Sequence, residues 1–381
     1  MKYAMSSINI NPPFPIKLGG FIQQVNPVST IHDDLHARII SFADQGKKVY
    51  LVSCDNLGFK INVQNEIQNK LGPNCTVILS CTHTHFAPDS TNTEYQEYFI
   101  NKVYNECMSL VYTTGDLSIK YVHEKFDKIG RSRISNHIAN VVLQVLSIFD
   151  KDKCIATIIT HNCHPTILSG DTPYISSEYP GYVIKKLSKD YKDVFFSFFQ
   201  GATGDISSRF TRITQDYAGV EYLGNILVDE IKKIINTPSV FKSFNTFDIH
   251  EHVIPMEHDL SPINLSDIPL DLTEREKETI DIGIKVRERL LHNIDSLDKE
   301  IVISSLKLES INLIFAPNEL FSYYTKAIDE DNSVLICYSN GYSPYVSGIN
   351  ENYITYETFT DTLTTDTKHK IFDTIHILSS L

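Results

Sequence analysis

The chain has 381 residues, with 34 lysines and arginines against 47 aspartates and glutamates, and a formal net charge of −13. This acidic balance argues against a nucleic-acid backbone or an anionic membrane surface as the main partner. With 42% hydrophobic and 21% charged residues, the composition is that of a globular protein with a large core and not of a disordered chain.

The N-terminal residues show no targeting signal. The first twenty contain no apolar run and carry prolines at positions 12 and 13, which predicts neither a secretory signal nor a transit peptide. No apolar stretch approaches the ~20 residues that a transmembrane helix needs. The seven cysteines are scattered without a C-x-x-C pair, which favours reduced thiols and a cytoplasmic location.

Short apolar runs and helical patterns alternate along the first half of the chain. The predicted strands lie at 48–54, 76–81, 155–160 and 194–199, and the predicted helices at 61–71, 94–112 and 180–191. This alternation is typical of an α/β fold whose sheet is covered on both faces.

The second half has fewer regular patterns. Residues 241–271 are irregular and strand-like, and a capping box of Thr273 and Glu276 then starts a helix. Further strands are predicted at 311–315 and 334–337. With no internal repeat and no Pro/Gly/Ser-rich linker, we predict the α/β class, with a mixed β-sheet core flanked by helices in a single large domain over residues 1–381.

The commonest catalytic motifs are absent from the sequence. It contains no P-loop, no G-x-G-x-x-G, no G-x-S-x-G elbow and no H-E-x-x-H. The usual nucleotide-binding, serine-hydrolase and zincin interpretations are therefore excluded.

Histidine pairs follow two of the predicted strands, at the ends where α/β sheets gather their ligand sites. His83 and His85 are two residues apart, so in an extended chain both imidazoles face one side. His161 and His164 follow the strand at 155–160, and either one is a candidate ligand or a hydrogen-bonded core histidine. A further pair, His250 and His252, has no such context and is interpreted as two ordinary polar residues.

Other polar groups also come after predicted strands. They are the small-residue segment 201–207 with Asp205 and Ser207, then Glu319, Tyr342 and Tyr345. Each alone is an ordinary loop residue, and tyrosine is a rare metal ligand because a cation must lower its pKa. Their common placement after apolar strands favours a shared functional site over unrelated loop residues.

In order along the chain, these segments resemble the catalytic domain of the neutral/alkaline ceramidase family. The matching segments run from about residue 5 to about residue 360. They are residues 7–13, 20–21, 31–38, 52–55, 82–88 (THTHFAP), 163–166, 175–181, 204–207 (GDIS), 317–319 (PNE), 340–345 (NGYSPY) and 356–357.

The resemblance implies a zinc-dependent amidase that cleaves the N-acyl bond of a sphingoid lipid. The implied zinc ligands are His83, His164, Glu319 and Tyr345, with Tyr342 as the alternative to Tyr345. It also places His85 beside the metal-bound water and Asp205 and Ser207 at the active site. The arginine near the substrate carbonyl is then Arg131 or, less favoured, Arg133. Such ligands are N and O donors that suit Zn²⁺.

The sequence also departs from the family pattern. It shows no signal peptide and no added C-terminal β-sandwich domain, Ser208 replaces a proline, and Phe86 and Ala87 replace Ser-Gly. These differences leave the substrate open. The alternatives are a non-lipid N-acyl, N-acetyl or ester compound, or a non-catalytic binding role on the same scaffold.

Overall fold

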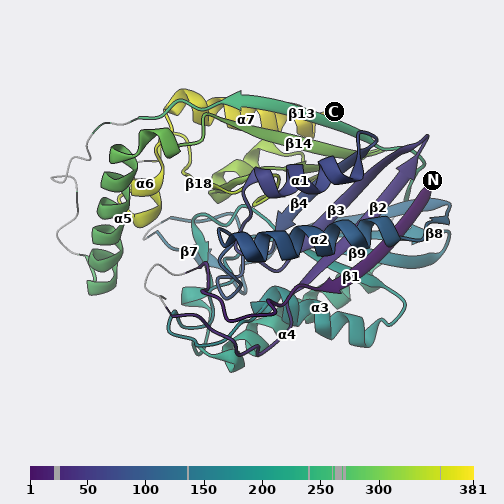
Figure 1. The fold of residues 1–381 in the computed structure, drawn as a ribbon, viewed down its shortest axis with the longest axis horizontal. Helices are drawn as coiled ribbons and strands as arrows, with labels where there is room; N and C mark the ends of the chain where they lie inside the picture. Colours follow the sequence, from purple (N-terminus) through teal and green to yellow (C-terminus); the bar gives the residue numbers. More distant parts are fainter. Residues whose placement is uncertain are drawn as a thin grey trace.

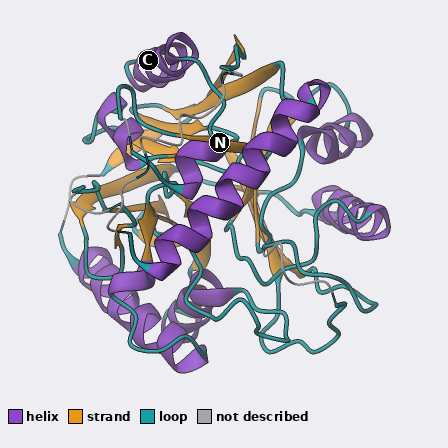
Figure 2. Cartoon of the chain, turned by 90° about the vertical axis from the view of Figure 1, so that its left-hand side faces the viewer, coloured by secondary structure: helices purple, strands orange, loops and turns teal. Residues whose placement is uncertain are grey.

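The structure is a computed structural model that describes residues 1–20, 26–134, 137–238, 241–259, 261, 268, 272–351 and 353–381. Its strands form three larger sheets and two short strand pairs among these residues. Helices lie around the outside of the strands (Figure 2).

The first sheet is built from the N-terminal part of the chain. Its strands, in the spatial order β4-β3-β2-β1-β5, are β1 (Lys2–Asn9), β2 (His36–Asp44), β3 (Lys47–Cys54), β4 (Cys75–Cys81) and β5 (Thr113–Thr114). β1, β2 and β3 are antiparallel neighbours, and β4 lies parallel to β3 after the crossover helix α1 (Ile61–Leu71). α2 (Thr93–Ser109) packs beside α1 on the same face of the sheet (Figure 1).

The second sheet repeats this arrangement. Its strands, in the order β10-β9-β8-β6-β12, are β6 (Leu117–Lys125), β8 (Val142–Asp150), β9 (Lys153–His161), β10 (Phe195–Gln200) and β12 (Lys242–Phe244). β6, β8 and β9 are antiparallel neighbours, and β10 is parallel to β9 after the helix α3 (Glu178–Asp190). α4 (Tyr217–Asn236) packs against α3.

The third sheet follows the same rule with a shorter crossover. Its strands, in the order β13-β14-β15-β17, are β13 (Asp248–Pro255), β14 (Glu300–Leu308), β15 (Ile311–Phe315) and β17 (Ser333–Ile336). β13, β14 and β15 are antiparallel neighbours and β17 is parallel to β15. α7 (Thr365–Ser379) packs on this sheet, at the top of Figure 1.

The remaining elements connect or flank these sheets. They are β7 (Arg131–Ser132), β11 (Ile206–Ser207), η1 (Ser208–Phe210), α5 (Glu274–His292), η3 (Ile294–Ser296), β16 (Asn318–Leu320), η4 (Ser322–Ala327), β18 (Ser343–Val346) and α6 (Tyr356–Thr360). β7 pairs with β11, and β16 pairs with β18. α5 and α6 pack on each other, beside β18.

The three parallel strand pairs meet at their carboxyl ends. The amide of Cys81, the last residue of β4, donates to the Tyr338 carbonyl at 3.0 Å, and the Cys337 amide after β17 donates to the Gln200 carbonyl of β10 at 2.8 Å. Ser80 of β4 also forms an isolated bridge with Ser339. Because these ends converge, the loops that follow β4, β9, β10, β15 and β17 share one small region.

The core between the sheets is apolar. One buried cluster draws members from all three sheets, including Leu51 of β3, Ile158 of β9 and Phe315 of β15. The α/β class with a mixed sheet core and flanking helices is therefore confirmed. Where the alternation predicted one sheet covered on both faces, the structure divides the strands among three larger sheets whose inner faces share this cluster.

Most of the predicted elements are present with small shifts. The capping box at Thr273 and Glu276 starts α5 as expected. The helix predicted at 94–112 ends at Ser109, where the backbone of Leu110 leaves the helical conformation, and Thr113 and Thr114 then pair with β1. Most of residues 260–271, which end the irregular segment, lie outside the described residues. The single-domain extent of 1–381 stays a prediction.

Within the described helices, no segment is both long and apolar enough for a membrane crossing.

Glu178 fixes the loop after β9 to the start of α3. It is fully buried, and Oε1 accepts the Ile167 and Leu168 amides while Oε2 accepts the Tyr179 amide. Its φ of +57° lies in the left-handed region, which a non-glycine residue enters only where its surroundings hold it. Burial raises the pKa of Glu178 to about 7, although the three amides favour the charged form.

Replacing Glu178 by alanine is expected to lower the free energy of unfolding by about 2–4 kcal/mol, since three buried amides lose their acceptor. Urea unfolding measures the change, with the exposed Glu221→Ala on α4 as the control. An equal small effect of both variants would contradict the assigned role.

The same residue gives the protein a predicted pH dependence. Since the pKa of Glu178 is about 7 in the folded chain against an ordinary 4.5, folding favours the protonated form. Its contribution to stability is complete below about pH 4.5 and is lost as the pH rises towards about 7. Urea unfolding of Glu178→Gln across this range should lack that part of the slope, and an unchanged slope would refute the assignment.

Candidate metal centre

His83 enters the convergent region directly after β4. Its φ of +65° is in the left-handed region, where a non-glycine residue is uncommon. The His83 amide donates to the Asn56 carbonyl at 2.9 Å, and ring Nδ1 lies 2.7 Å from the Leu57 carbonyl. Because a carbonyl only accepts, Nδ1 carries the hydrogen and Nε2 presents a lone pair.

His164 and His85 are held in the same way. Nδ1 of His164 lies 3.0 Å from the Thr203 carbonyl, and Nδ1 of His85 lies 2.9 Å from the Gly20 carbonyl. A Cβ on Gly20 would lie 2.2 Å from the His85 Cβ, so only glycine lets this backbone approach the ring. In all three histidines Nε2 is therefore the nitrogen that can bind a metal, the arrangement in which metal-binding histidines are usually found.

Glu319 on β16 completes the tightest part of the cluster. The Nε2 atoms of His83 and His164 are 3.1 Å apart, and Glu319 Oε2 lies 3.4 Å from each of them. Ligand atoms of a tetrahedral ion with bonds of about 2.0–2.1 Å lie about 3.3–3.4 Å apart. The three donor atoms therefore already have the mutual spacing of three corners of such a site.

Two further observations fit a cation between these atoms. Glu319 Oε2 is buried and has no hydrogen-bond donor among the described residues, which is costly unless another positive group faces it. The ligand atoms of His83, His85 and His164 also all lie within 4.8 Å of one another. The wider spacing of that set makes His85 the outer member, beside the tighter group of His83, His164 and Glu319.

The pKa shifts favour neutral His164 and His85 beside a charged Glu319 carboxylate. Burial, with the neighbouring Arg133, lowers the pKa of His164 to about 3. Burial and the nearby His83 hold the pKa of His85 well below its usual range. Burial acts to raise the pKa of Glu319, but His83 and His164 outweigh it and keep the pKa well below the usual range. Deprotonated donors are the form that a metal binds.

The two candidate tyrosines occupy different positions. Tyr342 donates its hydroxyl hydrogen to Glu319 Oε1 at 2.6 Å, so it holds the carboxylate oxygen that faces away from the histidines. Tyr345 pairs with Glu319 across β16 and β18, and its ring centre lies 6.4 Å from that of His164. Burial and the Glu319 charge raise the pKa of both tyrosines well above the usual range, so a phenolate forms there only beside a cation.

Of the two arginines considered from the sequence, Arg133 is the one that reaches the cluster. Its Nη1 lies 2.6 Å from Glu357 Oε1 of α6, and both side chains are largely buried. Burial acts to lower the pKa of Arg133, and the hydrogen-bonding neighbours Tyr345 and Glu357 raise it above its usual range. Arg131 is exposed on β7, and its backbone pairs with that of Ser207.

Asp205 and Ser207 support the centre from the loop after β10. Asp205 accepts the Ser322 amide at 2.5 Å and the Ser322 hydroxyl at 2.7 Å, which ties this loop to the chain that leaves β16. Ser207 forms a parallel bridge with His164, and its Oγ accepts the Arg209 amide at 3.1 Å. The backbone can come this close because a Cβ on Gly204 would lie 2.7 Å from the Glu319 carbonyl oxygen.

The other sequence candidates are elsewhere. His161 is buried in the core, with Nδ1 2.7 Å from the Val142 carbonyl and its pKa lowered by burial to about 4. His250 and His252 lie on β13, away from the centre as predicted. Sequence reasoning missed Tyr338, whose ring stacks on His83 at 3.9 Å between centres. Its place directly after β17 was the available signal.

Comparisons with known proteins support the same fold. No family model matches the chain, and no curated protein matches it by sequence. Two solved structures, one described as a ceramidase complexed with C2 and one as neutral ceramidase from Pseudomonas aeruginosa, match with TM-scores of 0.76 and 0.75. Each shares 14% identity, covering 99% of this chain and 74% of the other. The predicted resemblance is therefore confirmed at the level of the fold.

If the histidines around Glu319 hold a metal ion, changing one of them should release it. We expect His164→Ala to lose more than nine-tenths of the bound divalent cation, measured by elemental analysis of the purified protein. His250→Ala on β13 is the matched control and should keep its metal. Equal metal content in both variants would contradict the assigned centre.

Proposed function

We propose that this chain, which has the fold of neutral ceramidase, is a zinc-dependent hydrolase that cleaves an N-acyl amide bond. The observation that carries the proposal is the tetrahedral spacing of His83 Nε2, His164 Nε2 and Glu319 Oε2. Two imidazoles and a carboxylate are a set that catalytic zinc sites use, with further positions left for a tyrosine or water.

The tyrosines take separate roles in this proposal. Tyr345 is the protein's fourth ligand, since it stands across the β16–β18 pair from Glu319 and is not the one bonded to Oε1. Tyr342 orients Glu319 by its hydrogen bond, as groups behind metal ligands commonly do. Zinc bound here would lower the pKa of a water towards ~7 and polarise the amide carbonyl.

Arg133 and His85 supply the remaining chemistry. The Arg133 guanidinium, held by Glu357, offers N–H donors to the oxygen on which negative charge develops when the amide is attacked. The Nε2 of His85, whose Nδ1 is fixed on the Gly20 carbonyl, is the atom that would carry a proton to the departing amine. Asp205 and Ser207 hold the loop that carries the Thr203 carbonyl, and so keep the His164 ring in place.

The proposed substrate is a lipid amide. One similar structure is described as a ceramidase complexed with C2, which supports an N-acyl sphingoid substrate for this chain. The formal net charge of −13 gives no reason to propose a nucleic-acid partner. A cytoplasmic location remains a prediction.

Hydrolysis should depend on the metal and on the acyl lipid. With N-acyl sphingosines as substrates, we expect a chelator to abolish hydrolysis and added Zn²⁺ to restore it. Hydrolysis is measured by chromatography of the released sphingoid base. Short N-acyl amines and acetylated sugars are the parallel substrates. Faster turnover of these soluble compounds would mean that the substrate is a small metabolite and not a lipid. Activity that survives complete metal removal would overturn the proposal.

Removing the guanidinium should affect the reaction more than substrate binding. Arg133→Met is expected to lower kcat by about 100-fold, because it deletes a donor to the developing charge, with a much smaller change in KM. The matched control is Arg131→Met on the exposed β7, which should leave both constants unchanged. Loss of activity in the Arg131 variant alone would reverse the assignment.

A further inference from the structure

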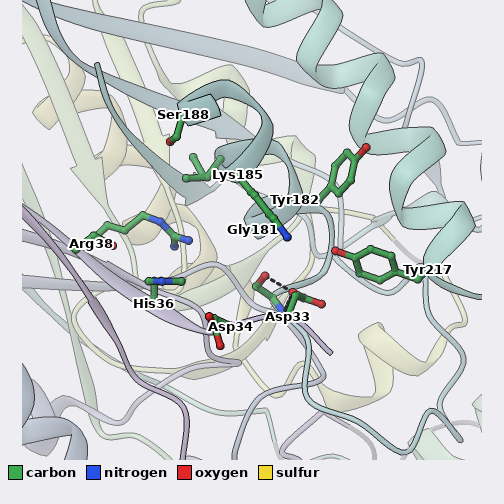
Figure 3. Close-up of a pocket in the computed structure, with 12 residues that line it drawn as sticks. Asp33, Asp34, His36, Arg38, Gly181, Tyr182, Lys185, Ser188 and Tyr217 are labelled. Atoms are coloured by element: carbon green, nitrogen blue, oxygen red, sulfur yellow. Dashed lines mark hydrogen bonds between the residues drawn. The ribbon is translucent and has the colours of Figure 1, made fainter. Parts of the chain in front are cut away.

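A cavity lined by several charged and polar residues lies apart from the metal centre, between the start of β2 and the helix α3. Its volume is about 310 Å³, which is at the lower end of the range for small-molecule sites. The wall includes Asp33, Asp34, His36, Arg38, Lys185 and Tyr217, and none of His83, His164 and Glu319 belongs to it (Figure 3).

Two charged groups on the wall are fixed before any ligand arrives. The Asp33 carboxylate accepts the Ser176 hydroxyl and the Ser177 amide, each at 2.7 Å. On the other side Arg38 is buried and donates from Nη1 to Asp55 at 2.9 Å. This is the one hydrogen bond of the Arg38 side chain within the described ranges, and a guanidinium has five N–H donors. Arg38 lines the cavity, and its other N–H donors are left for a ligand. Because Asp33 and Arg38 are both held by hydrogen bonds, the site is preorganised on both sides.

Two opposite charges at the cavity remain without ion-pair partners. Asp34 accepts a hydrogen bond from the Asn11 amide at 2.6 Å. Among the residues that the structure describes, neither Asp34 nor Lys185 has an oppositely charged group within ion-pair distance. In Figure 3 the Lys185 side chain enters the cavity from above, and Asp34 lies below it. The cavity thus separates two charges that would otherwise attract each other.

The distribution of charge and rings gives the cavity two different ends. Lys185 and Arg38 provide positive charge and N–H donors suited to a phosphate or carboxylate. Asp33 and Asp34 provide negative charge, and Tyr217 on the side away from Arg38 adds an aromatic face of the kind that attracts ammonium groups (Figure 3). Burial and the neighbouring Arg38 lower the pKa of His36, so it adds no third cation.

We propose that this cavity binds a small zwitterion, with its ammonium group towards Asp34 and its acid group towards Lys185 and Arg38. Such a ligand satisfies both unpaired charges at once, whereas a simple cation or anion satisfies one and meets repulsion from the other end. The site is independent of the proposed amide hydrolysis, since it shares no residue with the metal centre.

The test is isothermal titration of the purified, metal-loaded protein with O-phosphoethanolamine, and separately with ethanolamine and with inorganic phosphate. The variants are Asp34→Asn and Lys185→Gln, both at exposed positions that leave the core intact. Lys189→Gln, also exposed on α3 but outside the cavity, is the matched control.

We expect saturable binding of the zwitterion that is tighter than that of either half. Asp34→Asn and Lys185→Gln should each weaken it by about fivefold, the effect of an exposed charge pair, while Lys189→Gln leaves it unchanged. The proposal is overturned if O-phosphoethanolamine does not bind saturably, or if ethanolamine or phosphate alone binds as tightly. It is equally overturned if either cavity variant leaves the affinity unchanged.

Discussion

The centre depends on three hydrogen bonds between histidine Nδ1 atoms and backbone carbonyls. Leu57, Thr203 and Gly20 accept from His83, His164 and His85, and each bond fixes both the tautomer and the direction of the ring. Without them, rings of this kind could rotate or exchange protons, and the spacing around Glu319 would be lost. The acceptors are main-chain atoms, so the fold itself sets the geometry of the donors.

The fold delivers these carbonyls by repeating one strand pattern three times. In each large sheet three antiparallel strands are followed by a strand parallel to the third. The parallel pairs converge at their carboxyl ends, where loops carry polar groups without disturbing the apolar strands. No sequence repeat accompanies this pattern, because each strand needs only an apolar face and the loops differ in their chemistry.

Local patterns in the sequence predicted most of the strands and helices of the first half and the start of α5. Strand ends are recognisable from the end of an apolar run, so the polar groups that follow strands could be selected as candidates from the sequence. The choice between residues of one motif was not accessible in this way. Arg131 and Arg133 lie two positions apart, and only the contact with Glu357, 224 residues further along, distinguishes them. The same holds for Tyr342 and Tyr345, which differ in their contacts with Glu319 and not in their sequence context. The packing of the sheets against one another also depends on such distant contacts, which is why the local patterns predicted one covered sheet and not three sheets packed together.

The central claim is that His83, His164 and Glu319 hold one zinc ion through nitrogen and oxygen atoms. X-ray absorption at the zinc edge of the purified protein tests it most directly. The account predicts four or five N/O ligands at about 2.0–2.1 Å with the scattering pattern of imidazole. A sulfur shell at about 2.3 Å, or a spectrum of zinc surrounded only by water, would contradict it.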